Sequence, residues 1–400
     1  MDWGNGPEAN LSVFLSIPFC LHKCSYCDLN AYAGLGNLIP AYVDALIREI
    51  DLIGSGADAA IHTIYFGGGT PSVIPTPLLA QLFSAIRNSF RVAENCEISF
   101  EANPETLTAE YLDALKQLGV NRLSLGAQSA QANELALFQR THTWADVERA
   151  VELARQARFD NLSLDLIYGL PGQTLARWQD TLARALALNP DHFSVYALSL
   201  DFNTPMRAWV QRGLLLEPDD DLAADMYQWA DEELKPAGYE QYELSSWAKQ
   251  ENSKSQIPNF KMCKHNLQYW RNLPYLGLGA GAHGCWGGWR YSNVGNPVAY
   301  VNRMNSNTKP PFPFSFALHE SSQIDYNTEM NETMLTGLRL VNEGVRAADF
   351  QARFGAGLRD VFAVELGDLE ARGLVEWNEA GIRLTAESRF VSNWVFERFV

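Results

Sequence analysis

Three cysteines lie within eight residues near the start of the chain and carry the plainest chemistry in the sequence. Cys20, Cys24 and Cys27 have the spacing C-x3-C-x2-C in the stretch IPFCLHKCSYC. Thiolates on one short loop can each hold one iron of a 4Fe-4S cubane, which leaves the fourth iron open to another ligand. An electron-transfer cluster would close all four irons with cysteine, and a zinc site would usually bring a second C-x2-C pair, which this sequence lacks. The triplet therefore predicts a cluster with one exchangeable position.

A second group of polar residues comes at the ends of predicted strands. The run Gly67-Gly68-Gly69-Thr70 lets the backbone approach a ligand and adds a hydroxyl, although the same residues would suit a plain tight turn. Glu101 ends the next strand, where a carboxylate can accept a hydrogen bond from an ammonium group or a ribose hydroxyl. The alternative for Glu101 is a helix cap or a solvated charge.

Three further residues extend this polar set. Gln128 ends a strand in SLGAQS, Arg140 follows in FQRTH, and Asp165 interrupts the apolar stretch SLDLIYGL. A carboxylate inside a buried strand must be paired or functional. A buried Arg140–Asp165 ion pair without a ligand is the alternative to a binding site.

The elements that must position these residues alternate regularly up to about residue 245. Short β-rich runs are predicted at 11–16, 61–66, 96–101, 121–127, 161–167 and 192–198. Amphipathic helices are predicted at 41–53, 77–90, 109–118, 144–157, 174–188 and 222–234. The strands are apolar almost throughout, as expected when both faces of a parallel sheet are covered. This alternation predicts an α/β fold, either a barrel or a doubly wound sheet, and in a barrel the polar residues would gather on the C-terminal face.

The pattern changes after residue 245. Residues 246–320 are rich in aromatics, glycine and asparagine, and we interpret the uncharged run 272–289 within them as a glycine-rich loop and 304–315 as a proline-rich connector. Residues 321–400 predict helices followed by a hairpin, which is typical of a winged-helix module. Acidic residues outnumber basic ones there, so an accessory or lid role is favoured over DNA binding.

Composition narrows the function classes. The 400 residues carry a net charge of −16, which argues against a nucleic-acid or anionic-membrane surface. The first ten residues hold two acids and no Lys or Arg, unlike an export signal, and no run reads as a membrane span. We therefore expect a soluble cytoplasmic protein whose reduced thiols are free for metal chemistry.

The cysteine triplet after the first strand, together with the glycine-rich turn after the second, resembles the radical S-adenosylmethionine (SAM) superfamily. The resemblance implies that SAM chelates the open iron through its methionyl amine and carboxylate, and that an electron from the cluster cleaves it to a 5′-deoxyadenosyl radical. It also implies a partial (β/α)6 barrel, which agrees with the alternation of strands and helices.

Segments along nearly the whole chain resemble a narrower group, oxygen-independent coproporphyrinogen oxidase and its relatives, the HemN/HemW family. They are IPFCLHKCSYCD, YFGGGTPS, FEANPE, GVNRLSLGAQS, DLIYGLPGQT, GYEQYELSSWA, KHNLQYW and YLGLGAGAHG. Carried over by position, the cluster ligands are Cys20, Cys24 and Cys27, and the implied SAM contacts are Phe14, Tyr26, Gly68, Gly69, Thr70, Glu101, Gln128, Arg140 and Asp165. Phe14 stands where the family often has tyrosine, so a hydroxyl contact is lost. In the oxidase the counterparts of Tyr26, Gln128, Arg140 and Asp165 lie by a second SAM, whose presence here stays open.

Two departures favour the haem-chaperone branch, HemW, over the oxidase. The oxidase has a further cysteine where this chain has Leu29, and His265-Asn266-Leu267-Gln268-Tyr269-Trp270 matches the H-N-x-x-Y-W signature of that branch. Histidine is a standard axial ligand of haem iron, so His265 is the candidate ligand, with a structural hydrogen-bonding role as the alternative. His283 is a second candidate in a stretch that departs from the family pattern, and Cys263 is a speculative third. Cys96 and Cys285 are interpreted as structural.

We therefore expect a 4Fe-4S, SAM-binding protein that carries haem to acceptor haemoproteins and is closer to a chaperone than to a turnover enzyme. The expected units are an N-terminal tail (1–10), the barrel (11–245), a haem-side segment (246–320) and the C-terminal module (321–400). The alternatives are oxidative decarboxylation of coproporphyrinogen, a radical porphyrin methyltransferase, and a zinc-stabilised barrel without radical chemistry. A carrier that serves respiratory proteins would approach a membrane only through a partner, and the oligomeric state stays open.

Overall fold

One mixed sheet of twelve strands organises the larger part of the protein, in the order β14-β13-β12-β11-β1-β4-β5-β6-β7-β8-β10-β9. The structure is a computed structural model that describes residues 11–250, 260–306 and 310–400, so the expected tail at 1–10 and part of the proline-rich connector lie outside the described residues. No helix in these described ranges is long and apolar enough to cross a membrane.

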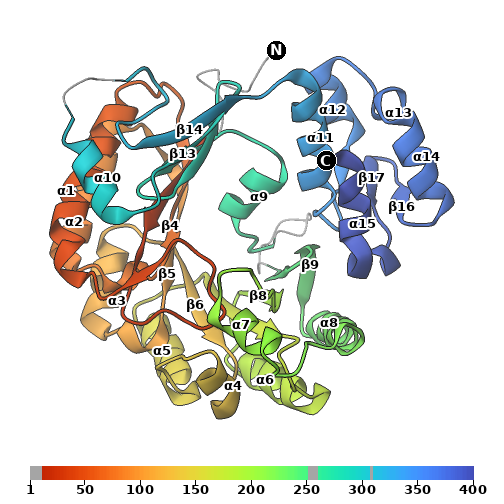
Figure 1. Ribbon diagram of the computed structural model, residues 1–400, viewed down its shortest axis with the longest axis horizontal. Coiled ribbons are helices and arrows are strands. Elements are labelled where there is room, and N and C mark those ends of the chain that lie inside the picture. Colours follow the sequence, from red (N-terminus) through yellow and green to blue (C-terminus); the bar gives the residue numbers. More distant parts are fainter. Residues whose placement is uncertain (1–10, 251–259, 307–309) are drawn as a thin grey trace.

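Six neighbouring parallel strands form the predicted alternating unit. They are β1 (Leu11–Ile17), β4 (Ile61–Gly68), β5 (Val92–Ala102), β6 (Arg122–Gln128), β7 (Leu162–Tyr168) and β8 (His192–Ala197). The helices between and after them are α1 (Ile39–Gly54), α2 (Thr76–Ser89), α3 (Ala109–Gln117), α4 (Ala132–Leu137), α5 (Trp144–Gln156), α6 (Leu175–Ala187), α7 (Pro205–Gln211) and α8 (Asp220–Leu234). The predicted α/β barrel-type fold is confirmed, and Figure 1 shows the helices along the outside of the curved sheet.

The parallel strands alternate between an apolar outer face and a more polar inner face. In β1, Leu11, Val13 and Leu15 are fully buried in the same core cluster as residues of α1. The inner face carries Ser12, whose hydroxyl lies 2.5 Å from that of Thr63. The expectation of strands that are apolar almost throughout therefore holds for the helix-covered face, while the other face lines the barrel with polar side chains.

The interpretation of residues 272–289 as a loop is wrong. This run contains β11 (Tyr275–Leu278) and β12 (His283–Trp286), and β13 (Trp289–Asn293) and β14 (Leu318–Gln323) continue the sheet beyond it. Its glycines allow close packing: a Cβ on Gly277 would lie 1.8 Å from the His283 carbonyl oxygen, and Gly279 has φ +97°. A high glycine content here marks tightly packed strands.

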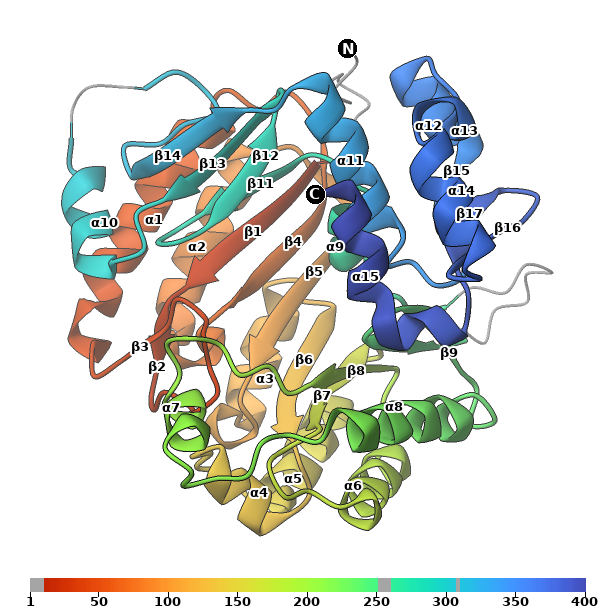
Figure 2. The same cartoon turned by 45° about the vertical axis from the view of Figure 1, so that its right-hand side comes forward.

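The remaining elements extend the sheet at both edges and build a second core. β9 (Tyr239–Glu243) and β10 (Ser246–Lys249) end the sheet, α9 (Lys264–Trp270) contacts β4 and β5, and α10 (Pro297–Met304) packs on α1. The C-terminal module comprises α11 (Tyr326–Gly337), β15 (Val345–Arg346), α12 (Ala347–Phe354), α13 (Leu358–Val361), α14 (Ala363–Ala371), the hairpin β16 (Val375–Trp377) and β17 (Gly381–Leu384), and α15 (Ser392–Phe396). Figure 2 shows this module, in blue, beside the sheet with α9 behind α11 and α15.

Candidate functional site

The cysteine loop begins where β1 ends and is pinned to the opposite side of the barrel. β2 (Phe19–Cys20) pairs with β3 (Tyr32–Ala33), and the Ser25 hydroxyl donates to the Leu137 carbonyl oxygen at 2.7 Å. The Tyr26 ring packs edge-on against Phe138, with 4.7 Å between ring centroids. Cys20, Cys24 and Cys27 are free thiols, each partly exposed. The loop therefore holds three free thiols at a fixed place.

A cavity of about 510 Å³ brings the three cysteines together with most of the other predicted site residues. Its lining includes Tyr26, Gly68, Gly69, Thr70, Glu101, Gln128, Arg140 and Asp165. Phe14 is not part of this lining. Its ring lies inside the barrel, 6.1 Å from the Tyr65 ring and 6.3 Å from the His265 ring.

The glycine-rich turn after β4 passes directly against the cysteine loop. A Cβ on Gly69 would lie 2.7 Å from the Phe19 carbonyl oxygen and 3.0 Å from the Cys20 sulfur. Gly68 has φ +110°, and Thr70 donates its hydroxyl to the Cys20 sulfur at 3.4 Å. The two glycines are therefore required by this close approach, which also places a donor beside a candidate cluster ligand.

Glu101 faces the cavity as a hydrogen-bonded but incompletely paired carboxyl group. It accepts from the Tyr65 hydroxyl at 2.8 Å and from the Gly68 backbone N–H at 3.3 Å. Burial raises the pKa of Glu101 to about 7. In the part of the chain that the structure describes, no basic side chain forms an ion pair with Glu101, so an ammonium group entering the cavity would find an acceptor in this carboxylate.

Asp165 is held by serines rather than by Arg140. The Ser124 hydroxyl lies 3.0 and 3.1 Å from its two oxygens, and the Ser163 hydroxyl lies 3.3 Å from Oδ1. Burial raises the pKa of this carboxyl group. Asp165 and Arg140 both lie in the described part of the chain, and no ion pair joins them. The alternative of a buried Arg140–Asp165 ion pair without a ligand is therefore wrong.

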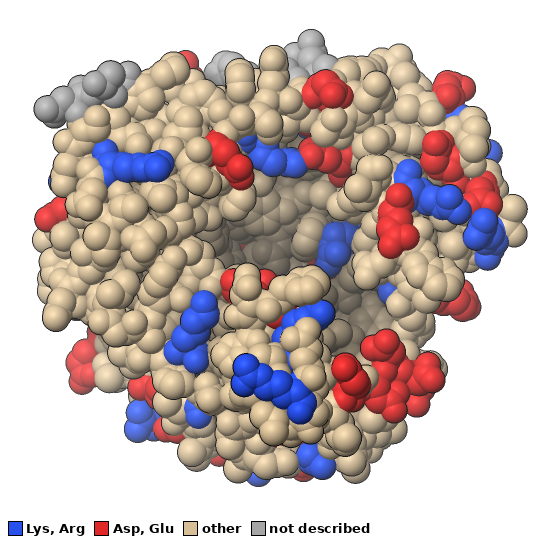
Figure 3. Space-filling model, in the orientation of Figure 1, with Lys and Arg blue, Asp and Glu red and all other residues tan. Residues whose placement is uncertain are grey.

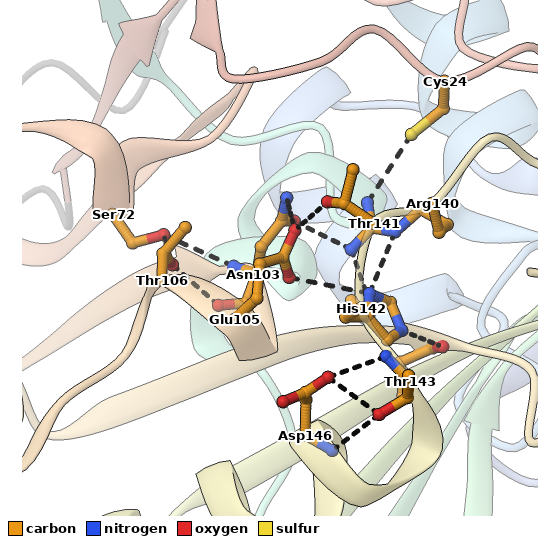
Figure 4. A network of polar contacts seen from close by, with 12 residues as sticks. Cys24, Ser72, Asn103, Glu105, Thr106, Arg140, Thr141, His142, Thr143 and Asp146 are labelled. Carbon is orange, nitrogen blue, oxygen red and sulfur yellow. Dashed lines mark hydrogen bonds and ion pairs between the residues drawn. The ribbon is translucent and has the colours of Figure 1, made fainter.

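Arg140 is instead directed at a cysteine. Its guanidinium donates to the Cys24 sulfur at 3.6 Å, to the Asn103 side-chain oxygen and the Gly126 carbonyl oxygen at 2.9 Å, and to His142 Nδ1 at 3.3 Å. His142 Nε2 lies 3.1 Å from the Ala127 carbonyl oxygen, which fixes the proton on Nε2 and leaves Nδ1 as the acceptor. Figure 4 shows this network from the cysteine loop to the start of α5.

Two members of the network, Asn103 and His142, were missed by the sequence reasoning. His142 is 3% exposed and stands two residues after Arg140, while Asn103 follows two residues after Glu101. Their closeness in sequence to the predicted residues is the one feature from which they could have been predicted. Gln128, which was predicted, has φ +65°, at a register shift between β6 and β7. Backbone strain of this kind is typical of functional sites.

The surroundings of the three thiols suit an iron–sulfur cluster. Hydrogen-bond donors from Thr70 and Arg140 already point at two of the sulfurs, as is common around cluster thiolates. Burial raises the pKa of Cys27 to about 11, so its thiolate needs a positive partner such as iron. In the described ranges no three His, Cys, Asp or Glu side chains are arranged for a single metal ion. This agrees with a 4Fe-4S cubane, in which each cysteine thiolate binds a different iron and the ligands do not converge on one metal ion.

His265 lies in a different part of the barrel, at the start of α9. It is 1% exposed, its Nδ1 lies 2.8 Å from the Thr63 hydroxyl and its Nε2 lies 2.9 Å from the Tyr269 hydroxyl. Burial lowers the pKa of His265 to about 3. Both ring nitrogens are therefore occupied, and iron ligation would require one of these hydrogen bonds to break.

The structure also shows where the other candidate haem ligands and the two remaining cysteines lie. Cys263 is fully buried beside Glu97, with 3.8 Å between the sulfur and Oε1, while His283 is exposed on β12. Cys285 lies in β12 rather than in a loop, and Cys96 is buried in β5 as expected. None of these four lines the cavity at the cysteine loop.

Comparison with known proteins relates an N-terminal and a C-terminal part of the chain to described families. The family described as the radical SAM superfamily matches residues 14–185, and the HemN C-terminal domain matches residues 324–391. A Bacillus subtilis protein named heme chaperone HemW is 35% identical over 97% of this chain and 99% of its own. Its namesake from Escherichia coli is 33% identical over 98% of each chain. Among solved structures, coproporphyrinogen III oxidase (HemN) from E. coli, a radical SAM enzyme, has a TM-score of 0.82 at 24% identity, covering 99% of this chain and 91% of its own.

Proposed function

Since the chain belongs to the HemW family within the radical SAM superfamily, we propose that it is a haem chaperone that binds haem and passes it to acceptor haemoproteins. The observation that carries the proposal is identity of about a third over essentially the full length to several proteins named heme chaperone HemW. Leu29, at the position of the oxidase's additional cysteine, is consistent with it.

The cysteine cavity would hold the cofactors. Cys20, Cys24 and Cys27 would ligate a 4Fe-4S cluster, and SAM would bind the open iron against Gly68, Gly69, Thr70 and Glu101. A bound cluster and SAM supply one-electron chemistry at the sulfonium. The chain's own residues orient that pair: the Glu101 carboxylate offers an acceptor for the methionyl ammonium, and Arg140 donates to the Cys24 thiolate.

The oxidase stands as the second candidate because the structural likeness to coproporphyrinogen III oxidase spans nearly the whole chain. That likeness is one of fold, and the same fold serves different functions. Gln128, Arg140 and Asp165, which resemble the second SAM site of the oxidase, do line the cavity.

One experiment separates the two candidates. The protein is reconstituted anaerobically with iron and sulfide, then given haem and an apo-haemoprotein in one arm, and coproporphyrinogen with SAM and a reductant in the other. We expect stoichiometric haem binding and transfer in the first arm and no protoporphyrinogen in the second. Formation of protoporphyrinogen above the rate of a Cys24→Ala control would overturn the chaperone proposal.

A further inference from the structure

The mouth of the cysteine cavity exposes large apolar side chains. Leu21 is 67% exposed, Leu29 52% and Phe202 84%. Leu29 and Tyr196 line the cavity, Leu21 stands between the lining residues Cys20 and His22, and Phe202 directly follows the lining residue Asp201. Apolar side chains gathered at one opening mark a binding surface for an apolar ligand.

An imidazole stands among these apolar side chains. Of the seven histidines in the chain, His142, His192 and His265 are buried and His62 is partly buried, so their rings are closed to a macrocycle. His22, His283 and His319 are exposed. His22 lies on the cysteine loop and lines the cavity mouth, whereas His283 and His319 lie on β12 and β14. His22 is thus an accessible nitrogen ligand beside an apolar surface.

Two cations flank the same mouth. Lys23 lines the cavity and its ammonium lies 3.3 Å from the Leu29 carbonyl oxygen. The Arg207 guanidinium lies 4.2 Å over the Phe202 ring. Figure 3, in the orientation of Figure 1, shows a hollow above α7 with both basic and acidic side chains around its rim. Asp28 and Asp201 also line the cavity, and their carboxylates offset the two positive charges there. Lys23 and Arg207 therefore attract an anion only on the side that faces away from the cavity.

A flat apolar ring with two carboxylates on one edge and an iron at its centre fits this combination. The apolar side chains would cover a face of the ring, the cations would pair with the propionates, and an imidazole is a standard iron ligand. We propose that the mouth of the cysteine cavity is the haem site and that His22 is the axial ligand. The inference rests on the proposed chaperone function and names the site that performs it.

The exposure of His22 suits a carrier. A haem held at the surface keeps its outer face open, so a histidine of the acceptor can approach the iron from that side. The Fe–N bond to the acceptor forms and the Fe–N bond to His22 breaks, with no change in the electron count of the iron. A ligand as enclosed as His265 could not exchange in this way without opening the barrel.

The test measures haem affinity of the full-length protein by absorbance titration, with the Fe–His stretching band of the ferrous haem protein read by resonance Raman spectroscopy. His22→Ala is expected to weaken binding at least tenfold and to remove the imidazole-ligated signal. His319→Ala, an exposed histidine on β14, is the matched control and should match wild type. A Leu29→Ser, Phe202→Ser double variant should weaken binding severalfold while keeping the Fe–His band.

The outcomes separate this inference from the proposed function. A wild-type protein that binds no haem overturns the chaperone proposal itself. Wild-type affinity retained in His22→Ala, or lost in His265→Ala with unchanged unfolding temperature, overturns the placement of the site while the chaperone function stands. Cluster absorbance is recorded for each variant, so a collapsed cysteine loop is distinguished from a lost haem ligand.

Discussion

The mouth of the cysteine cavity and the closed region around α9 contain the same residue types in opposite circumstances. At the mouth, Cys24 is partly exposed and His22 is exposed, and both line an open cavity. Around α9, Cys263 is fully buried and His265 has both ring nitrogens engaged. Residue type alone therefore does not distinguish a ligand from a structural group; what distinguishes them is whether the hydrogen-bonding capacity is already used within the protein.

The closed region stabilises the barrel. Its hydrogen bonds connect elements far apart in sequence, such as Thr63 on β4 to His265 on α9. The mouth of the cysteine cavity offers a ligand polar groups whose hydrogen-bonding capacity is not used within the protein. It contributes less to stability. This contrast predicts that mutations at the mouth change binding, whereas mutations around α9 change the free energy of unfolding.

The largest effect is expected at the cysteines. Cys24→Ala should abolish the brown absorbance of the reconstituted cluster, because a cubane with two remaining protein ligands is not retained. Cys263→Ala is the matched variant from the closed region and should keep full iron and sulfide content. Iron analysis and absorbance check both, and cluster loss in Cys263→Ala would break the contrast.

His265→Ala should lower the free energy of unfolding by about 3 kcal/mol, since it leaves the Tyr269 hydroxyl without this partner, removes one of the two partners of the Thr63 hydroxyl and opens a small cavity. Haem affinity should stay within twofold of wild type. Urea unfolding with a parallel haem titration measures both. The opposite pattern, stable protein with weak haem binding, would identify His265 as the ligand after all.

The buried histidine also predicts a dependence on pH. The pKa of His265 is lowered to about 3 by burial, while in the unfolded chain it is about 6.5. Between these values only the unfolded state takes up the proton, so stability is full above pH 6.5 and is lost as pH falls. Wild type should lose about 1.4 kcal/mol per pH unit more than His265→Gln between pH 6 and 4. Carboxyl groups with raised pKa, such as Glu101, act with the opposite sign in both proteins and cancel in the difference.

A smaller effect is expected from the network behind the cluster. His142→Ala removes the acceptor that orients Arg140, and the hydrogen bond from Arg140 to the Cys24 sulfur should weaken. Loss of about 1 kcal/mol of stabilisation of the reduced cluster lowers its potential by roughly 40 mV. Redox titration measures this shift. An unchanged potential in His142→Ala, with the shift present in Arg140→Gln, would show that His142 does not position the arginine.

The sequence predicted the parallel strands and most of the cavity because both depend on local signals. Strand ends, glycines and motif spacing placed Cys20, Gly69 and Glu101 correctly at one edge of the sheet. What it could not predict depends on contacts between distant segments. Gly279 and Gly281, in the turn between β11 and β12, pack against Ser16 and Asn30, which lie about 250 residues away in the chain, so the sequence around them looked like a loop.

Phe14 and His265 show the same limit at single residues. Family position implies a ligand contact for each, which stays a prediction; the structure shows that both rings lie near Tyr65 inside the barrel. An inward-facing side chain of the parallel strands either borders the cavity or is covered inside the barrel. Which of the two occurs depends on how α9, much later in the chain, packs against it. That helix is separated from β4 by about 200 residues, so no local pattern reports the contact.

The smallest effect on stability is expected for the largest exposed aromatic at the mouth. Phe202 is 84% exposed and its contact with Arg207 lies at the surface, so Phe202→Ser should change the free energy of unfolding by less than about 0.5 kcal/mol. Phe19→Ser, at a buried aromatic of the cysteine loop, is the matched comparison and should cost about 3–5 kcal/mol. If Phe202→Ser destabilises the protein comparably, the mouth is part of the folding core and its apolar side chains need no ligand to explain them. If stability is kept and haem affinity falls, the exposed ring serves binding alone.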